Sequence, residues 1–195
     1  MKRVLLFVVA FCSVLPLVHA QGSANRDNKE IHWITSFDEL QEKMKQNPKK
    51  VYMDIYTDWC GWCKKMEAST FSNPDLIKYM NLNFYCVRFN AERQDNIQFN
   101  GKLYQYNPQY KANMLAVELM GGPNKLSFPT SILMLENFQN PNPIAGYLTV
   151  AQIEPILTFF GDNYIRHQPW DSYSKTYKPT WDHGMAADNT PPPGH

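Results

Sequence analysis

Two cysteines three residues apart form the most reactive pattern in this sequence. The segment Cys60-Gly61-Trp62-Cys63 places both thiols on one face of a helix, about 5–6 Å apart and within reach of a disulfide. At the start of that helix, unpaired backbone amides and the helix dipole favour the thiolate of Cys60 over its thiol. A stabilised thiolate attacks disulfides and leaves readily from mixed disulfides. The spacing therefore predicts thiol–disulfide chemistry in which Cys60 reacts first and Cys63 second.

Two other interpretations of the pair stay open: a structural disulfide, and half of a zinc site. A structural zinc ion usually takes four ligands, and the sequence has no second Cys-x-x-Cys. The histidines beyond the N-terminal segment are scattered through expected loops and chain ends, namely His32, His167, His183 and His195. We therefore favour redox chemistry and expect neither a metal nor an organic cofactor.

A strand, a helix and a second strand surround the cysteine pair. β-type runs occupy residues 51–56 and 84–89, and a helical stretch runs from about residue 60 toward residue 71. These are the ingredients of a crossover unit, in which a helix connects two parallel strands. A Cys-x-x-Cys beside such a unit is typical of a thioredoxin-like redox motif.

Capping signals predict where the other helices begin. Ser36 and Asn73 each precede a helical pattern, and Thr149 with Gln152 forms a capping box for a helix that contains Pro155. Further strands are expected at residues 31–34, 131–135 and 144–148.

The stretch between the second β-type run and residue 127 carries its own signals. Asn100-Gly101 lies between two short β-type runs and predicts a hairpin. Asn107-Pro108 is expected to cap a long helix that ends at Gly121-Gly122.

The segment around the cysteines resembles the active-site segment of the thioredoxin superfamily. In that family an aspartate lies six residues before the first cysteine, a tryptophan directly before it, and a lysine directly after the second. Asp54, Trp59 and Lys64 occupy those three places. Arg88 stands where a lysine of the family usually faces the buried aspartate.

Two later segments are also similar to that family. Phe128-Pro129-Thr130 resembles its cis-proline loop, and Gly146 fits the glycine of its last strand. The resemblance runs in order through residues 31–160. It implies an α/β thioredoxin fold, with a central mixed sheet flanked by helices.

The sequence departs from the family in three places. Gly61-Trp62 separates the cysteines where thioredoxin has Gly-Pro. Residues 91–127 form an insert, which we expect to hold the hairpin and the long helix. Residues 166–195 form a C-terminal extension, and its Pro-rich end is expected to be disordered. The thioredoxin-like domain is thus expected at residues 31–165.

Asp54 is the third candidate catalytic residue. On a strand that is covered on both faces its carboxyl is buried, which raises its pKa and lets it accept the proton of Cys63. The alternative is an ordinary solvated strand residue. Arg88 is either the partner of Asp54 or a solvated residue of its own strand, and the sequence does not decide between them.

The resemblance also implies a substrate-binding set around the cysteines, made up of Trp59, Gly61, Trp62, Phe128 and Pro129. A cis proline at position 129 is expected to pack against the two sulfurs, while the backbone of Phe128 pairs with an extended substrate strand. The alternative is a trans proline that starts a strand.

Two other features of the sequence are expected to be structural. Cys86 is a single cysteine inside an apolar strand, which is typical of a buried, inert thiol. Trp170, Tyr173, Tyr177 and Trp181 form an aromatic stripe that packs on its own domain or, alternatively, binds a partner.

Composition excludes several classes of protein. Of the 195 residues, 44% are hydrophobic, which is enough for one domain with a real core. Lys and Arg number 19 against 18 Asp and Glu, without a basic run, so nucleic acid is not expected as a partner. Four cysteines are too few for a disulfide scaffold in a chain of this length.

The N-terminus has the pattern of an export signal. Lys2-Arg3 precedes an apolar run over residues 4–17, and Val18-His19-Ala20 offers a cleavage site before a polar leader at residues 21–30. Residues 1–20 are therefore predicted to be a signal peptide. The protein is expected to be exported: periplasmic if bacterial, otherwise secreted or in the lumen of the secretory pathway. No stable membrane insertion is expected after cleavage.

Together these features predict an exported thiol–disulfide oxidoreductase that acts on protein disulfides or thiols. We expect a monomer that works as a reductase and depends on a separate redox-recycling partner. Two alternatives stay open: a disulfide oxidase or isomerase, and a non-catalytic binding module on a thioredoxin fold.

Overall fold

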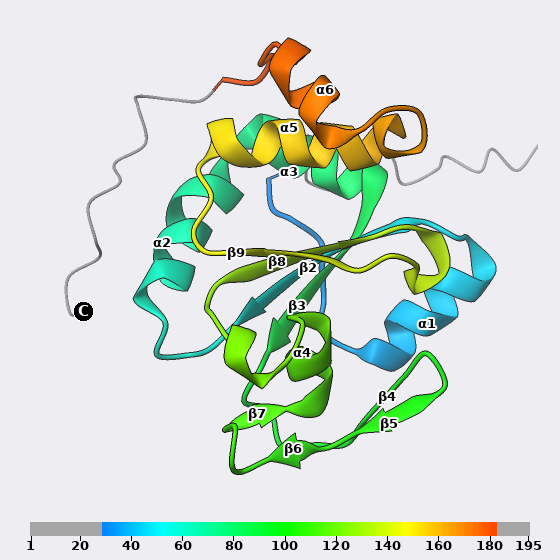
Figure 1. Ribbon diagram of the computed structural model, residues 1–195, viewed down its shortest axis with the longest axis vertical. Coiled ribbons are helices and arrows are strands. Elements are labelled where there is room, and N and C mark those ends of the chain that lie inside the picture. The colour runs from blue at the N-terminus through cyan, green and yellow to red at the C-terminus, as the bar shows by residue number, and fades with distance from the viewer. Residues whose placement is uncertain (1–28, 183–195) are drawn as a thin grey trace, which may run out of the picture.

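A five-stranded mixed sheet lies at the centre of the fold (Figure 1), in a computed structural model that describes residues 29–182. The strand order is β1-β3-β2-β8-β9. β1, β3 and β2 run parallel, and β8 pairs antiparallel with both β2 and β9. The strands are β1 (Trp33–Ile34), β2 (Lys50–Tyr56), β3 (Phe84–Asn90), β8 (Thr130–Met134) and β9 (Asn142–Ala145). The predicted α/β fold, a mixed sheet flanked by helices, is confirmed.

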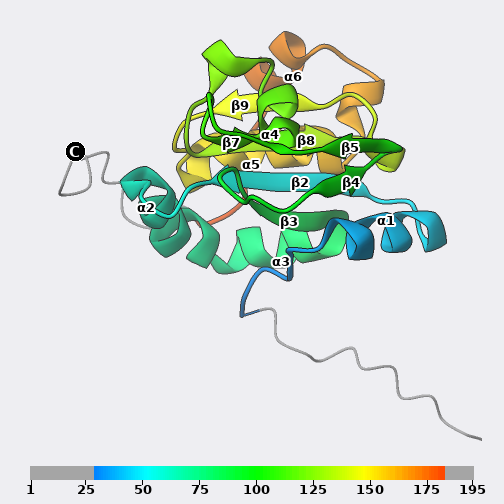
Figure 2. The ribbon, with the colours of Figure 1, turned by 90° about the horizontal axis from the view of Figure 1, so that it is seen from below.

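Helices cover both faces of this sheet. One face packs against α1 and α4, and the other packs against α2, α3, α5 and α6. Figure 2 shows α4 and the hairpin strands in front of the sheet on the first of these faces. The helices are α1 (Phe37–Gln46), α2 (Gly61–Ser69), α3 (Pro74–Asn83), α4 (Met114–Leu119), α5 (Val150–Gly161) and α6 (Trp170–Thr176).

The central strand β2 is buried on both faces. Val51, Met53 and Ile55 belong to the core cluster beside α1 and α4, and Tyr52 belongs to the cluster beside α3 and α5. This is the alternation expected of a strand, in which successive side chains point to opposite faces. Asp54 follows the Tyr52 side and is only 2% exposed.

The predicted helix starts are confirmed at three capping residues. Ser36 accepts the amide of Glu39 at 3.3 Å, and Asn73 accepts that of Leu76 at 3.0 Å. Thr149 and Gln152 bond reciprocally, which completes the capping box of α5. Each bond satisfies an amide that the first turn of a helix leaves unpaired.

The insert contains the predicted hairpin, formed by β4 (Ile97–Phe99) and β5 (Lys102–Tyr104). Its turn residues Asn100 and Gly101 both have positive φ, 47° and 79°. Asn-Gly is the favoured pair for a two-residue turn of this kind.

The predicted long helix from Asn107-Pro108 is wrong. Asn107 instead belongs to β6 (Tyr106–Asn107), which pairs with β7 (Ala112–Asn113). Its side chain accepts the amide of Gln109 at 2.9 Å, so it closes a turn rather than capping a helix. The helix begins only at Met114, where Asn113 accepts the amide of Leu115 at 3.1 Å. It ends before Gly121-Gly122, as predicted.

The last strand lies earlier than predicted, at 142–145 instead of 144–148. Gly146 has φ of 98°, and its amide donates to the carbonyl of Pro129 at 2.8 Å, which turns the chain out of the sheet. Pro143 is tolerated within β9 because this strand is at the edge of the sheet.

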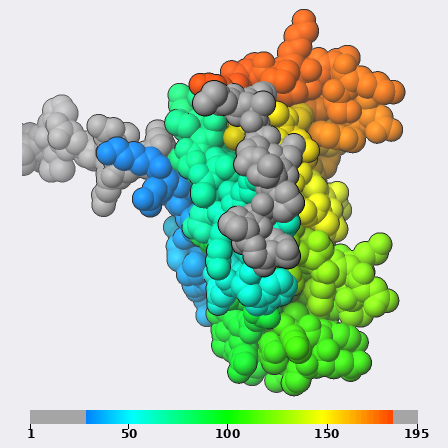
Figure 3. All heavy atoms as spheres, turned by 90° about the vertical axis from the view of Figure 1, so that its left-hand side faces the viewer, coloured from blue at the N-terminus to red at the C-terminus, as the bar shows by residue number. Residues whose placement is uncertain are grey.

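The aromatic stripe of the C-terminal extension packs on its own domain. Tyr173 of α6 is 5% exposed, and its hydroxyl lies 2.7 Å from that of Thr158 in α5. Its ring also contacts those of Phe159 and Tyr177. In the space-filling view of Figure 3, this extension and the insert lie at opposite ends of the molecule.

Glu154, a fully buried residue of α5, anchors the segment that follows α6. Its Oε1 accepts hydrogen bonds from the Tyr177 hydroxyl at 2.7 Å, the Thr180 amide at 2.6 Å and the Trp181 amide at 3.1 Å. The ring of Trp181 then packs against Tyr79 of α3. This set of bonds, called the Glu154 anchor below, ties the extension to two helices.

The predicted signal peptide, residues 21–28 of the leader and the end of the chain that is predicted to be disordered, from residue 186 on, lie outside the described residues. Within residues 29–182, no helix is long and apolar enough to cross a membrane.

The Glu154 anchor predicts a local loss of protection when its acceptor is weakened. A neutral amide oxygen accepts hydrogen bonds more weakly than a carboxylate. Glu154→Gln should therefore speed exchange of the Thr180 and Trp181 amide hydrogens by about 10-fold, the equivalent of about 1.4 kcal/mol. Lys178→Gln, an exposed change in the same segment, is the control and should leave both rates unchanged. Equal rates in Glu154→Gln and the parent protein would contradict the anchor.

Candidate active site

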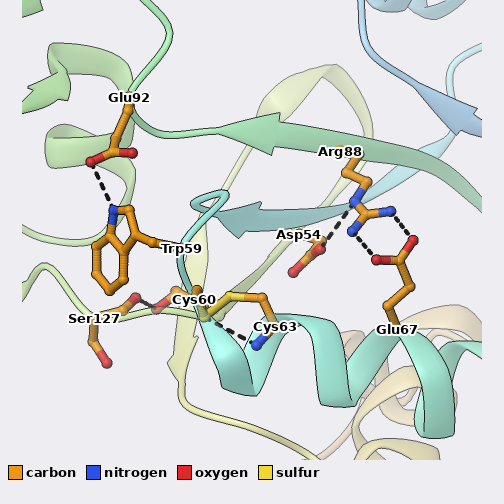
Figure 4. Close-up of a disulfide and its surroundings, with 9 residues drawn as sticks. Asp54, Trp59, Cys60, Cys63, Glu67, Arg88, Glu92 and Ser127 are labelled. Carbon is orange, nitrogen blue, oxygen red and sulfur yellow. Dashed lines mark hydrogen bonds and ion pairs between the residues drawn. A yellow bond between two sulfur atoms is a disulfide. The ribbon is translucent and has the colours of Figure 1, made fainter. Parts of the chain in front are cut away.

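The two cysteines form a disulfide at the point where β2 leads into α2 (Figure 4). The S–S distance is 2.08 Å, and the Cα atoms lie 5.3 Å apart. Cys60 is 2% exposed and Cys63 is 4% exposed. Within residues 29–182, no three His, Cys, Asp or Glu side chains lie together as a metal site.

Cys60 is the N-cap residue of α2. Its backbone is extended, with φ −71° and ψ 106°, and its Sγ accepts the amide of Cys63 at 3.0 Å. The sulfur thus stands where an oxygen of Ser or Asp normally caps a helix. An amide donor and the positive end of the helix dipole both stabilise negative charge on this sulfur.

Asp54 lies on β2, six residues before Cys60. It is buried, as predicted for a strand that is covered on both faces. Desolvation raises the pKa of this carboxyl to about 7, an effect that Arg88 opposes and Glu67 reinforces. Among the residues that the structure describes, Oδ1 of Asp54 has no hydrogen-bond partner. A carboxyl in this state can exchange a proton near neutral pH.

Arg88 lies directly opposite Asp54 on the neighbouring strand β3. Its Nε is 3.8 Å from Oδ2 of Asp54, while its two terminal nitrogens donate to Glu67 at 2.5 and 2.7 Å. Arg88 is therefore a charged neighbour of Asp54, but its hydrogen bonds go to Glu67.

Pro129 ends the loop that leads into β8, and the Phe128–Pro129 bond is cis, as predicted. The ring of Phe128 meets that of Trp59 edge to face, with centroids 5.9 Å apart. This contact brings the proline loop beside the residue that precedes Cys60.

Two aromatic pairs therefore flank the disulfide. The first is Trp59 with Phe128; Trp59 is 62% exposed, and its Nε1 donates to Glu92 at 3.0 Å. The second is Trp62 with Tyr147, whose centroids lie 5.4 Å apart.

The second pair is fixed to α2 through two side chains. Lys65 lies over both rings, 5.3 Å from that of Trp62 and 5.7 Å from that of Tyr147. The Tyr147 hydroxyl is 3.1 Å from that of Ser69.

Sequence reasoning did not find several residues of this site, among them Glu67, Glu92 and Tyr147. Glu67 carried a usable signal, because it lies four residues after Cys63 and so on the same face of α2. Glu92 and Tyr147 carried none, because each reaches the site from a loop that follows a strand.

Cys86 is a buried free thiol, as predicted. Burial raises its pKa to about 12, which leaves almost no thiolate at neutral pH. Redox chemistry in the described part of the chain therefore belongs to Cys60 and Cys63.

A cysteine pair at the start of the helix after the central strand, beside a cis-proline loop, defines a thioredoxin-like fold with a redox cysteine pair. Residues 22–112 match the Thioredox_DsbH family, described as a protein of unknown function, DUF255.

Curated relatives include two thiol:disulfide interchange proteins called DsbD. That of Haemophilus influenzae is 27% identical over 138 residues, which cover 65% of this chain and 22% of that protein. That of Escherichia coli K12 is 34% identical over 82 residues, 39% of this chain and 14% of that protein. The chain thus spans less than a quarter of the length of these relatives.

Two solved structures are also similar. A thioredoxin-fold protein from Helicobacter pylori is 16% identical, with 76% of this chain and 88% of that chain covered and a TM-score of 0.46. A DsbH oxidoreductase is 16% identical, with 78% and 92% covered and a TM-score of 0.42.

The raised pKa of Asp54 predicts how stability depends on pH. The folded protein holds this proton up to about pH 7, whereas the unfolded chain releases it near pH 3.8, so stability falls as the pH rises between these values. Asp54→Asn removes this loss. At about 1.4 kcal/mol per pH unit, it should stabilise the oxidised protein by roughly 2–4 kcal/mol at pH 8 and by under about 1 kcal/mol at pH 4.

Denaturant melts at both pH values measure this difference. Asp58→Asn, at an exposed position of the same loop, is the matched control and should change neither melt appreciably. A gain from Asp54→Asn that is equal at both pH values would show that the Asp54 carboxyl does not titrate as described.

Proposed function

We propose that this protein is an exported thiol–disulfide oxidoreductase that reduces disulfides in other proteins. The observation that carries the proposal is the position of Cys60, whose sulfur caps α2 and accepts the Cys63 amide. The names of the DsbD relatives agree with disulfide chemistry. Export is supported by the basic, apolar and small-residue pattern of residues 1–20.

Cys60 acts as the nucleophile in the first step. Its thiolate attacks one sulfur of the substrate disulfide, and the substrate S–S bond breaks. One substrate sulfur leaves as a thiolate, and the other remains bound to Cys60 as a mixed disulfide. The helix start stabilises the attacking thiolate of Cys60.

Cys63 resolves the mixed disulfide in the second step. Its proton passes to the Asp54 carboxylate, directly or through one water, and the resulting thiolate attacks the Cys60 sulfur. The Cys60–Cys63 disulfide forms, and the second substrate sulfur leaves as a thiolate. Two electrons have moved from the dithiol to the substrate, and a separate redox partner must return them.

The substrate binds across the reduced cysteine pair, between the two aromatic pairs. Trp59 and Phe128 form one side, and Trp62 forms the other together with Tyr147. Gly61 has no side chain and so adds no bulk beside the two buried cysteines. The backbone at Phe128 and Pro129 offers an edge for an extended substrate segment, as in strand addition to a sheet.

Alkylation of the reduced protein tests the role of Cys60. Because the helix start favours its thiolate, iodoacetamide at neutral pH should label Cys60 at least about 10-fold faster than Cys63 or Cys86. In Cys63→Ser the mixed disulfide should persist, and mass spectrometry should find the substrate on Cys60. Cys86→Ser is the control that retains the whole pair. Faster labelling of Cys63 would reverse the two roles.

Stopped-flow reduction of a model disulfide tests the role of Asp54. Asp54→Asn removes the proton acceptor and should slow resolution by roughly 10- to 100-fold, while the first attack by Cys60 keeps its rate. Asp58→Asn again serves as the control. Resolution at the parental rate in Asp54→Asn would remove Asp54 from the mechanism.

The direction of the reaction is tested separately. Equilibration of the Cys60–Cys63 pair with glutathione measures its potential, and an insulin-reduction assay measures catalysis. A pair that becomes oxidised in a glutathione mixture that keeps a disulfide oxidase reduced has the low potential of a reductase and supports reduction. Absence of any insulin reduction would favour a binding module.

A further inference from the structure

We propose that Glu67 is a positioning residue for the resolving step: it grips the guanidinium of Arg88 and holds it back from the Asp54 carboxyl. The proposal rests on the role proposed above for Asp54.

The distances in the cluster show which partner Arg88 prefers. Its Nη1 and Nη2 donate to the two oxygens of Glu67 at 2.5 and 2.7 Å, a bidentate pair, as Figure 4 shows. Its Nε stands 3.8 Å from Asp54 Oδ2, which is too long for a hydrogen bond. Both terminal nitrogens are thus committed to Glu67, and only the side of the planar group faces Asp54.

This arrangement of Arg88, Glu67 and Asp54 leaves two buried polar atoms without a hydrogen bond in the described part of the chain. Among the residues that the structure describes, Nε of Arg88 and Oδ1 of Asp54 make no hydrogen bond. Burial without a partner is unfavourable, so a closer contact between the two side chains is the arrangement that local energetics favour. Something must hold them apart, and the bidentate pair with Glu67 is the strongest contact that Arg88 makes.

Aromatic rings fix the guanidinium on its other sides. Its central carbon lies 4.8 Å from the ring centroid of Tyr56 and 5.9 Å from that of Trp33. Glu67 reaches Arg88 from α2, one turn after Cys63, with its side chain 51% exposed. The grip is therefore built into the same helix that carries the cysteines.

The groups that face Asp54 from each packed element support this balance. β3 contributes Arg88, and α2 contributes Glu67 and Cys63; β8 contributes Ser131, which is neutral. The phenols of Tyr52 and Tyr56 on β2 have raised pKa values, mainly through burial, and stay neutral.

Arg88 and Glu67 act on Asp54 in opposite directions. Arg88 lowers the pKa of Asp54, and Glu67 raises it. With the grip in place the positive charge is neutralised at its far end and kept at 3.8 Å, so Asp54 can take a proton near neutral pH. Without it, a closed Arg88–Asp54 pair would hold the carboxylate ionised and make it a weaker acceptor.

The test removes the grip and measures Asp54 directly. In Glu67→Ala, the titration midpoint of the Asp54 carboxyl, followed by carbon NMR, should fall by about one pH unit. The pH at which resolution reaches half its maximal rate should fall with it, while the rate of the first attack is kept. Glu67→Gln, which retains a neutral acceptor, should shift both by less. Glu42→Ala, at an exposed position of α1, is the control for net charge.

A double-mutant cycle separates positioning from simple repulsion between Glu67 and Asp54. If Glu67 acts by holding Arg88, its removal in an Arg88→Gln background should move the Asp54 midpoint by less than half as much. Equal shifts in both backgrounds, or no shift at all, would overturn the proposal. A shifted midpoint with an unchanged pH profile of resolution would instead uphold the grip and reject Asp54 as the proton acceptor.

Discussion

The burial of β2 on both faces is the constraint on which this structure depends. A central strand with helices on either side leaves no solvent for its side chains, so each must be apolar or must have its polar group accommodated. Tyr52 meets this demand by bonding the Ser131 hydroxyl at 2.7 Å. Asp54 does not meet it fully, and its raised pKa is the result.

The Asp54 carboxyl lies beneath the helix that carries the two cysteines. The carboxyl end of β2 passes through a short turn, closed by the Cys60 amide on the Thr57 carbonyl at 3.2 Å, into the start of α2. Parallel pairing of β2 with β3 brings Arg88 to the same level, and the following turn of α2 brings Glu67. Asp54, Glu67 and Arg88 thus come from one crossover unit, whereas Phe128 and Tyr147 reach the site from loops outside it.

The sequence predicted the features that depend on local chemistry. The Asn-Gly turn, the caps at Ser36, Asn73 and Thr149, and the helix start at Cys60 each follow from the preferences of a few adjacent residues. The α/β class and the position of the cysteine pair followed from these and from the resemblance to thioredoxin.

Prediction from the sequence failed where two nearby residues could each take the same structural role. Asn107 and Asn113 can both cap a helix, and the choice between them is made by the pairing of β6 with β7, which brings residues 106 and 113 together. The last strand was predicted too late because a proline such as Pro143 is tolerated only in an edge strand, and the sequence does not show that β9 is one. Glu92 and Tyr147 meet the cysteines only after the whole sheet has formed, so no window of sequence contains the contact.

The two core clusters lie on opposite faces of the sheet, and substitutions in each affect a different part of the molecule. The insert packs on the face of α1, and its hydrogen bond to the active-site loop is that of Glu92 with Trp59. The C-terminal extension packs on the face that holds α2, where Tyr173 and Met66 share one cluster. Substitutions within the insert therefore act first on the face of β2 that carries Val51, Met53 and Ile55, whereas loosening of the extension removes part of the core on which the cysteine helix packs.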